Sequence, residues 1–167
     1  MLQRLQKIFH GVSDVCFALS FAALAFITLL VNTDVFSRLL FHKSITWTTE
    51  ISEALILYMT FLGAEKVLRE DKHVKVDLLT NRVSDKTKSI LSVISACIGL
   101  IVSLFFVVFG VITTWSYYKR GIYNPSATEL PLAPVIAVIP FGGIFLSYEF
   151  LRKIVINLKT LSQKGSE

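Results

Sequence analysis

Four long apolar stretches dominate the chain and strongly restrict what it can fold into. They occupy residues 15–41, 45–67, 88–118 and 132–156. Each is longer than the roughly 20 residues that a helix needs to cross a hydrocarbon core of about 30 Å. With 53% hydrophobic and 17% charged residues, the 167-residue chain has little left for a soluble domain. We therefore predict an all-α integral membrane protein with four transmembrane helices, built as a single membrane domain over residues 1–167.

The distribution of Lys and Arg predicts how these helices are oriented. Thirteen of the 17 basic residues lie before the first stretch, in or beside the second gap, or in the tail, and four lie in the first and third gaps. Short segments rich in Lys and Arg remain in the cytoplasm. Trp47, Trp115, Tyr117 and Tyr118 lie at the opposite helix ends, where aromatic rings suit the headgroup boundary. Both termini are therefore expected in the cytoplasm.

The net charge of +5 is accordingly expected on the inner face of the membrane. Anionic headgroups of the cytoplasmic leaflet attract basic residues at that level. A basic protein can also bind nucleic acid, but here the charges flank membrane helices and form no folded soluble surface. Membrane lipids are therefore predicted partners, and nucleic acid is not.

The gap between the second and third stretches has a pattern of its own. Apolar residues at positions 74, 76, 78, 79 and 83 are interspersed with polar residues at 75, 77, 81, 82 and 85. This composition fits a short amphipathic helix on the inner membrane surface. A solvated loop is the alternative interpretation.

Small residues form a stripe along the third stretch. They are Ser92, Ala96, Gly99, Ser103 and Gly110. Their spacing of three, four or seven residues keeps them on one helix face. Small side chains let a neighbouring backbone approach closely, and membrane helices associate largely through such contacts. We therefore expect this stripe to face another helix, in this chain or in a partner subunit. In the fourth stretch, Pro140 predicts a kink.

Charged residues within the apolar stretches are the main functional candidates, because a charge inside a membrane is costly. Asp34 and Arg38 share one helix face, and Glu50 and Glu53 share another. Three further acidic residues lie nearer the predicted boundaries: Asp14, Glu65 and Glu149.

Two interpretations of the acidic pair at Glu50 and Glu53 remain open. In the first, the two carboxylates bind a cation or relay protons along a transport path. In the second, Arg38 and Lys43 are the candidates to neutralise them, which would fix the first hairpin or dock a partner subunit. Their position near the outer ends of the helices is shallow for a midplane substrate site, which favours the structural interpretation.

Other kinds of chemistry find little support in the sequence. The chain has no glycine-rich phosphate loop, no plausible Ser/His/Asp set and no Cys/His cluster with metal-ligand spacing. We therefore predict that it is not an enzyme and that it holds no catalytic, metal or cofactor site. Internal repeats typical of autonomous transporters are also not evident. Such a bundle is better suited to supporting another membrane protein.

The chain resembles the small membrane subunit, of the DctQ type, of TRAP (tripartite ATP-independent periplasmic) transporters. The resemblance extends over nearly the whole chain and depends on the order and spacing of several short segments. These are Asp34-Val35-Phe36-Ser37-Arg38, Trp47-Thr48-Thr49-Glu50-Ile51-Ser52-Glu53, Phe61-Leu62-Gly63-Ala64, His73-Val74-Lys75-Val76-Asp77 and the weaker Ser126-Ala127-Thr128-Glu129-Leu130-Pro131.

This resemblance implies a scaffold subunit in a bacterial inner membrane. In that family a periplasmic substrate-binding protein delivers an organic acid, and a large membrane subunit carries the substrate and the coupling sodium ions. The small subunit packs against the large one. The chain is most similar to the small subunits of sialic-acid systems, which favours sialic acid as substrate.

Two other functions remain as alternatives to the TRAP subunit. The first is a membrane anchor subunit of a redox enzyme complex, a class that often supplies haem-binding histidines or a quinone pocket. Here His10, His42 and His73 are not expected on facing helices. The second is a small multidrug exporter, a class that uses a deep acidic residue in its first helix, whereas Asp14 and Asp34 flank the first apolar run.

Overall fold

The computed structural model describes residues 2–70, 85–125 and 129–164, and most of these residues are helical. The helices are α1 (Leu2–Phe41), α2 (Thr46–Arg69), α4 (Asp85–Arg120) and α5 (Leu132–Lys164). Within the described residues there is no strand, and β-type pairing is limited to an isolated antiparallel bridge between Tyr123 and Pro131. Most of the predicted amphipathic segment falls at positions 71–84, outside the described residues.

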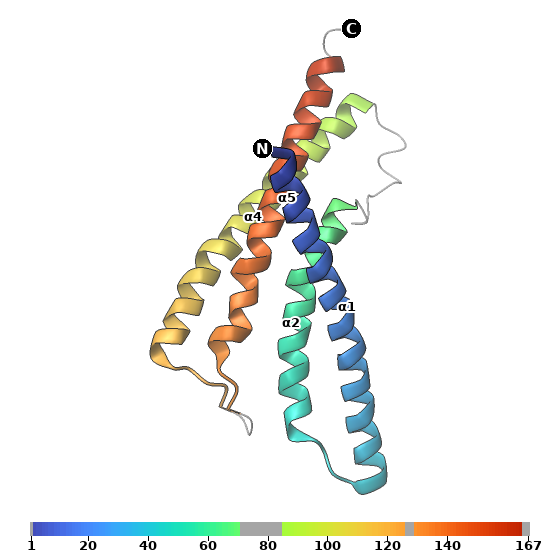
Figure 1. The fold of residues 1–167 in the computed structure, drawn as a ribbon, viewed down its shortest axis with the longest axis vertical. Coiled ribbons are helices and arrows are strands. Elements are labelled where there is room, and N and C mark those ends of the chain that lie inside the picture. Colours follow the sequence, from blue (N-terminus) through green and yellow to red (C-terminus); the bar gives the residue numbers. More distant parts are fainter. Residues whose placement is uncertain (1, 71–84, 126–128, 165–167) are drawn as a thin grey trace.

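The helices form two hairpins that meet along α2 and α5 (Figure 1). Helix α1 packs on α2, α4 packs on α5, and α2 also packs on α5. The hairpins lie closest near the two chain termini and separate toward the connections after α1 and α4 (Figure 1). The start of α1 and the end of α5 therefore lie toward the same end of the molecule (Figure 1).

Helices extend beyond the predicted apolar stretches. The first begins at Leu2 instead of position 15, and the last continues to Lys164 instead of ending near position 156. The additional turns are rich in polar residues, which water or headgroups can solvate while the backbone remains hydrogen-bonded. Hydropathy therefore located the apolar part of each helix and not its full length.

Three of the four helices are long and apolar enough to cross a membrane. The qualifying segments are Phe9–Phe41, Ser89–Arg120 and Leu132–Leu158. The remaining helix, α2, has 24 residues and is more polar, because its first two turns contain Thr, Ser and Glu side chains. At about 1.5 Å per residue it is long enough to reach across the same hydrocarbon core.

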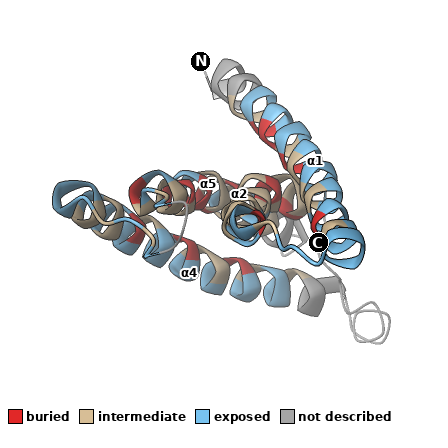
Figure 2. Cartoon of the chain, turned by 90° about the horizontal axis from the view of Figure 1, so that it is seen from below, coloured by how far each residue is buried: buried red, intermediate tan, exposed pale blue. Residues whose placement is uncertain are grey.

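Buried polar or charged residues outnumber buried hydrophobic ones in the part of the chain that the structure describes, and many large apolar side chains are exposed. The buried polar residues include Ser13, Ser20, Asp34, Ser103 and Glu149. Large apolar residues cover the outside of all four helices, and Figure 2 shows the exposed faces of α1 and α4 in particular. Water would oppose this arrangement, whereas lipid favours it because exposed polar groups are costly in hydrocarbon. The chain is therefore built to be solvated by lipid.

Candidate functional site

The buried carboxylate of Asp34 joins the two ends of the first hairpin. Its Oδ1 atom accepts a hydrogen bond of 2.7 Å from the backbone N–H of Ile45, the residue that precedes α2. The hydroxyl of Ser44 makes a longer contact of 3.4 Å with the same oxygen. Ile45 has no side chain able to cap the helix, so Asp34 supplies from α1 the negative charge that a helix N-terminus favours.

Arg38 forms an ion pair with Asp34, one helical turn before it. The sequence-based hypothesis that Arg38 neutralises Glu50 or Glu53 is therefore wrong in its choice of partner. Residues four apart on one helix lie on the same face and can pair directly. Contact between Arg38 and a residue of α2 depends in addition on how α2 is rotated about its axis.

The acidic pair on α2 lies in two different environments. Glu50 is half-buried, and among the described residues its Oε2 atom is buried without a hydrogen-bond partner. Glu53 is exposed, as is Trp47 at the start of the same helix. Among the described residues, neither glutamate forms an ion pair or a hydrogen bond with Asp34 or Arg38.

Small residues of α4 lie against α5 along most of the contact between the two helices. Ser103 is buried and accepts a hydrogen bond of 2.9 Å from the hydroxyl of Ser147. Near the end that holds the termini, Asn157 donates a 3.0 Å hydrogen bond to Ser92. Ala96 is also buried. These contacts leave little space between the helices.

The two glycines of this stripe permit the closest approach. A Cβ atom at Gly99 would lie 2.4 Å from the ring of Phe150, and one at Gly110 would lie 2.7 Å from Cδ of Pro140. Pro140 lies within α5, so its rigid ring is accommodated by the missing side chain of Gly110. The α4 stripe thus packs on a helix of the same chain.

Gly142 and Gly143 were not among the predicted site residues, yet they let α5 contact two helices at once. A Cβ atom at Gly142 would lie 2.5 Å from the backbone carbonyl oxygen of Phe61 in α2. At Gly143 it would lie 3.0 Å from Val107 in α4. The two adjacent glycines could have indicated these contacts. Consecutive residues lie on different faces of a helix, and a glycine on each face lets a neighbouring helix approach closely.

A network of charged side chains connects α1 and α2 at the end that holds the termini. The Nη2 atom of Arg69 donates to the carboxylate of Asp14 at 2.5 Å, and its Nη1 atom lies 2.7 Å from Nδ1 of His10. Lys66 contacts the same Asp14 oxygen at 3.1 Å. These residues are distant in sequence, so periodicity within one helix could not predict the network.

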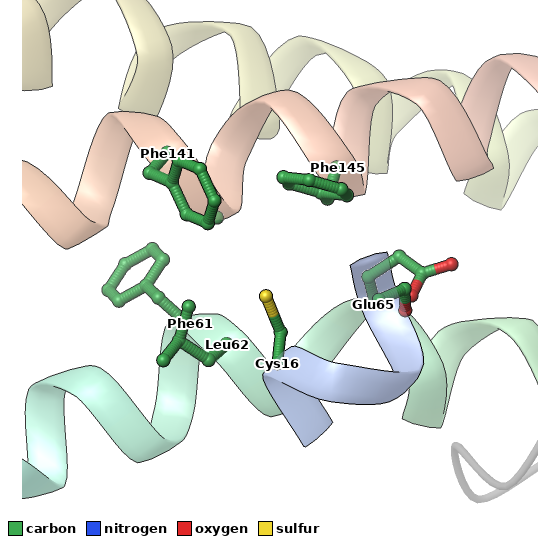
Figure 3. Close-up of a pocket in the computed structure, with 8 residues that line it drawn as sticks. Cys16, Phe61, Leu62, Glu65, Phe141 and Phe145 are labelled. Carbon is green, nitrogen blue, oxygen red and sulfur yellow. The ribbon is translucent and has the colours of Figure 1, made fainter. Parts of the chain in front are cut away.

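A small cavity lies beside this network, between α1, α2 and α5 (Figure 3). Its volume is about 10 Å³, which suits about one water molecule. Ser13 and Glu65 line it, and each has a buried side-chain oxygen without a hydrogen-bond partner among the described residues. Cys16 and aromatic rings such as Phe61 and Phe145 form most of the remaining wall (Figure 3). A substrate molecule would not fit.

Comparison with known proteins identifies the family. Residues 27–160 match the family described as Tripartite ATP-independent periplasmic transporters, DctQ component. A putative TRAP transporter small permease protein of Haemophilus influenzae is 25% identical over 152 residues, which cover 90% of this chain and 92% of the relative.

Two relatives with named substrates are similarly distant. The Sialic acid TRAP transporter permease protein SiaT of Haemophilus influenzae is 23% identical over 78% of this chain, but the match spans only 21% of the length of SiaT. The Ectoine TRAP transporter small permease protein TeaB of Halomonas elongata is 22% identical over 81% of this chain and 71% of its own length. The match to the DctQ component includes the C-terminal part of α1, all of α2 and α4, and the membrane part of α5. The chain therefore belongs to the DctQ family of tripartite ATP-independent periplasmic transporters.

Proposed function

We propose that this chain is the small scaffold subunit of a TRAP transporter in a bacterial inner membrane. It would support a large membrane subunit in the sodium-coupled uptake of an organic acid that a periplasmic binding protein delivers. The family match carries this proposal. The close internal packing and the apolar exterior also favour a supporting role, because neither the small cavity nor the end charges offer a substrate path across the bundle.

Sialic acid is the favoured substrate, on the basis of the similarity to SiaT. In this proposal the substrate and the sodium ions bind to the large subunit, and this chain acts by holding that subunit in the membrane. Catalytic and cofactor chemistry have no part in such a role.

Uptake by reconstituted complexes tests this function. We expect proteoliposomes that contain this chain, the large membrane subunit that co-purifies with it and the binding protein to accumulate sialic acid when an inward sodium gradient is imposed. Omission of this chain should reduce the uptake at least tenfold. Ectoine, the substrate named for TeaB, is the control solute. Full uptake without this chain would refute the scaffold role. Uptake of ectoine without uptake of sialic acid would refute sialic acid as the substrate.

We further propose that all four helices cross the membrane, with both termini in the cytoplasm. The basic residues of the charged network at the shared end of the bundle support this orientation through the positive-inside rule. Helix α2 would be the crossing that is least apolar, shielded on two sides by α1 and α5.

Cysteine labelling tests the orientation. In a background with Cys16→Ala and Cys97→Ala, Tyr123→Cys should react with a membrane-impermeant maleimide in intact spheroplasts. Glu70→Cys should react only after the cells are lysed. Both positions are exposed in the structure, so membrane sidedness and not burial would decide the result. The opposite labelling pattern would reverse the proposed orientation.

A further inference from the structure

A second, larger pocket lies between α2, α4 and α5, at the end of the bundle that holds both termini. Its volume is about 270 Å³. Three basic side chains line it, those of Arg69, Arg152 and Lys153. Ser92 and Asn157 add neutral polar groups to the wall. The small cavity beside Ser13 is separate and has different lining residues.

Nearby acidic groups leave this wall basic. Glu149 also lines the pocket, but its side chain is 2% exposed and accepts hydrogen bonds of 2.9 and 3.2 Å from Nη1 of Arg152. Asp14 lies next to the pocket and is shared between Arg69 and Lys66. The carboxylates therefore orient the guanidinium groups, and the pocket is lined by three basic side chains and one acidic side chain.

The pocket lies at the level where hydrocarbon gives way to headgroups. Ser92 lies three residues inside one end of the apolar segment Ser89–Arg120, and Asn157 is the penultimate residue of Leu132–Leu158. Ile156, another wall residue, is 49% exposed and offers an apolar surface beside the charged groups. A ligand that suits both kinds of surface has an anionic head and an apolar tail.

We propose that this pocket binds the phosphate group of an anionic phospholipid, such as phosphatidylglycerol, from the leaflet that faces the cytoplasm. Arg152 and Lys153 contact the phosphate, and Ile156 contacts the start of an acyl chain. Guanidinium groups match the geometry of phosphate oxygens, and basic pockets between membrane helices on the cytoplasmic side suit lipid headgroups. The lipid would connect α2 to the α4–α5 hairpin. Transport function lies outside this proposal, which depends only on the orientation proposed above.

Native mass spectrometry of the purified full chain tests the site. We expect dioleoyl phosphatidylglycerol to bind at least tenfold more tightly than dioleoyl phosphatidylcholine, which has the same phosphate diester but no net charge. Lys153→Gln should weaken phosphatidylglycerol binding by roughly fivefold, the factor that corresponds to about 1 kcal/mol per basic residue. Arg152→Lys keeps a cation beside Glu149 but loses the planar fork, so it should also weaken binding severalfold.

Lys43→Gln is the matched control, because it removes the same charge from an exposed position at the opposite end of the bundle. It should leave the affinity for phosphatidylglycerol unchanged, and circular dichroism should show each variant as helical as the parent chain. Equal binding of the two lipids, or equal effects of Lys153→Gln and Lys43→Gln, would overturn the proposal. Displacement of phosphatidylglycerol by millimolar inorganic phosphate would assign the pocket to free phosphate instead.

Discussion

Substituting Gly142 with alanine is expected to destabilise the bundle more than alanine at any other glycine of α4 or α5. The new Cβ atom would lie 2.5 Å from the carbonyl oxygen of Phe61 and 2.8 Å from its Cβ atom. Both atoms are fixed to the helix, so α2 and α5 must move apart. Overpacking of this kind costs about 1–3 kcal/mol. We expect the midpoint of unfolding in mixed detergent and dodecyl sulfate micelles, followed by circular dichroism, to fall accordingly.

Gly11→Ala is the matched control for this prediction. A Cβ atom at Gly11 would meet nothing within 4 Å, and the residue lies inside α1. Alanine favours the helix over glycine by about 1 kcal/mol, so this variant should be as stable as the parent or slightly more stable. Gly99→Ala should fall between the two, because the ring of Phe150 can rotate away. Equal stability of Gly142→Ala and Gly11→Ala would show that α2 and α5 do not pack closely in the membrane.

Removal of the Asp34 carboxylate is the second change with a large expected effect. Asp34→Ala leaves the N–H of Ile45 without its acceptor and Arg38 without its ion-pair partner. A donor that loses its partner away from water is costly, and the start of α2 also loses a favourable charge. We expect the thermal unfolding midpoint in detergent to fall by roughly 3–6 °C. Hydrogen exchange at the first turn of α2 should increase.

Three further variants separate the two contributions of Asp34. Asp34→Asn keeps an oxygen that can accept from Ile45 but loses the charge, so it should recover part of the stability. Arg38→Ala removes only the ion pair, whose guanidinium is more than half exposed, and should have the smaller effect. Glu53→Gln changes an exposed acidic residue and should have almost none. If Asp34→Ala and Glu53→Gln were equally mild, the carboxylate would not hold the hairpin together.

Local patterns predicted much of the candidate site. The stripe from Ser92 to Gly110 could be recognised because residues three, four or seven apart share a helix face, and that face lies on α5 in the structure. The spacing of Asp34 and Arg38 likewise indicated a common face, and the two side chains pair. Such relations depend only on the geometry of one helix, so the sequence contains them.

Contacts between helices could not be predicted in the same way. Arg38 was assigned to the acidic residues of α2 because those carboxylates needed a partner, but in the structure it pairs with Asp34 on its own helix. The rotation of α2 about its axis decides this, and an apolar helix without a strong polar face gives little indication of that rotation.

Hydropathy and segment length were enough to predict long apolar helices, because both are properties of each segment alone. The charge bias of the sequence also predicts an orientation that labelling can test. Only the folded structure reveals that α5 packs both on α4, its partner in the hairpin, and on α2 of the other hairpin. Gly142 lies against Phe61 of α2, and Gly143 lies against Val107 of α4. The fold also brought Arg69 to Asp14 and His10, 55 and 59 residues away in the chain. The physical reason is that helix association in lipid depends on the close fit of particular surfaces, which no hydrophobic period specifies.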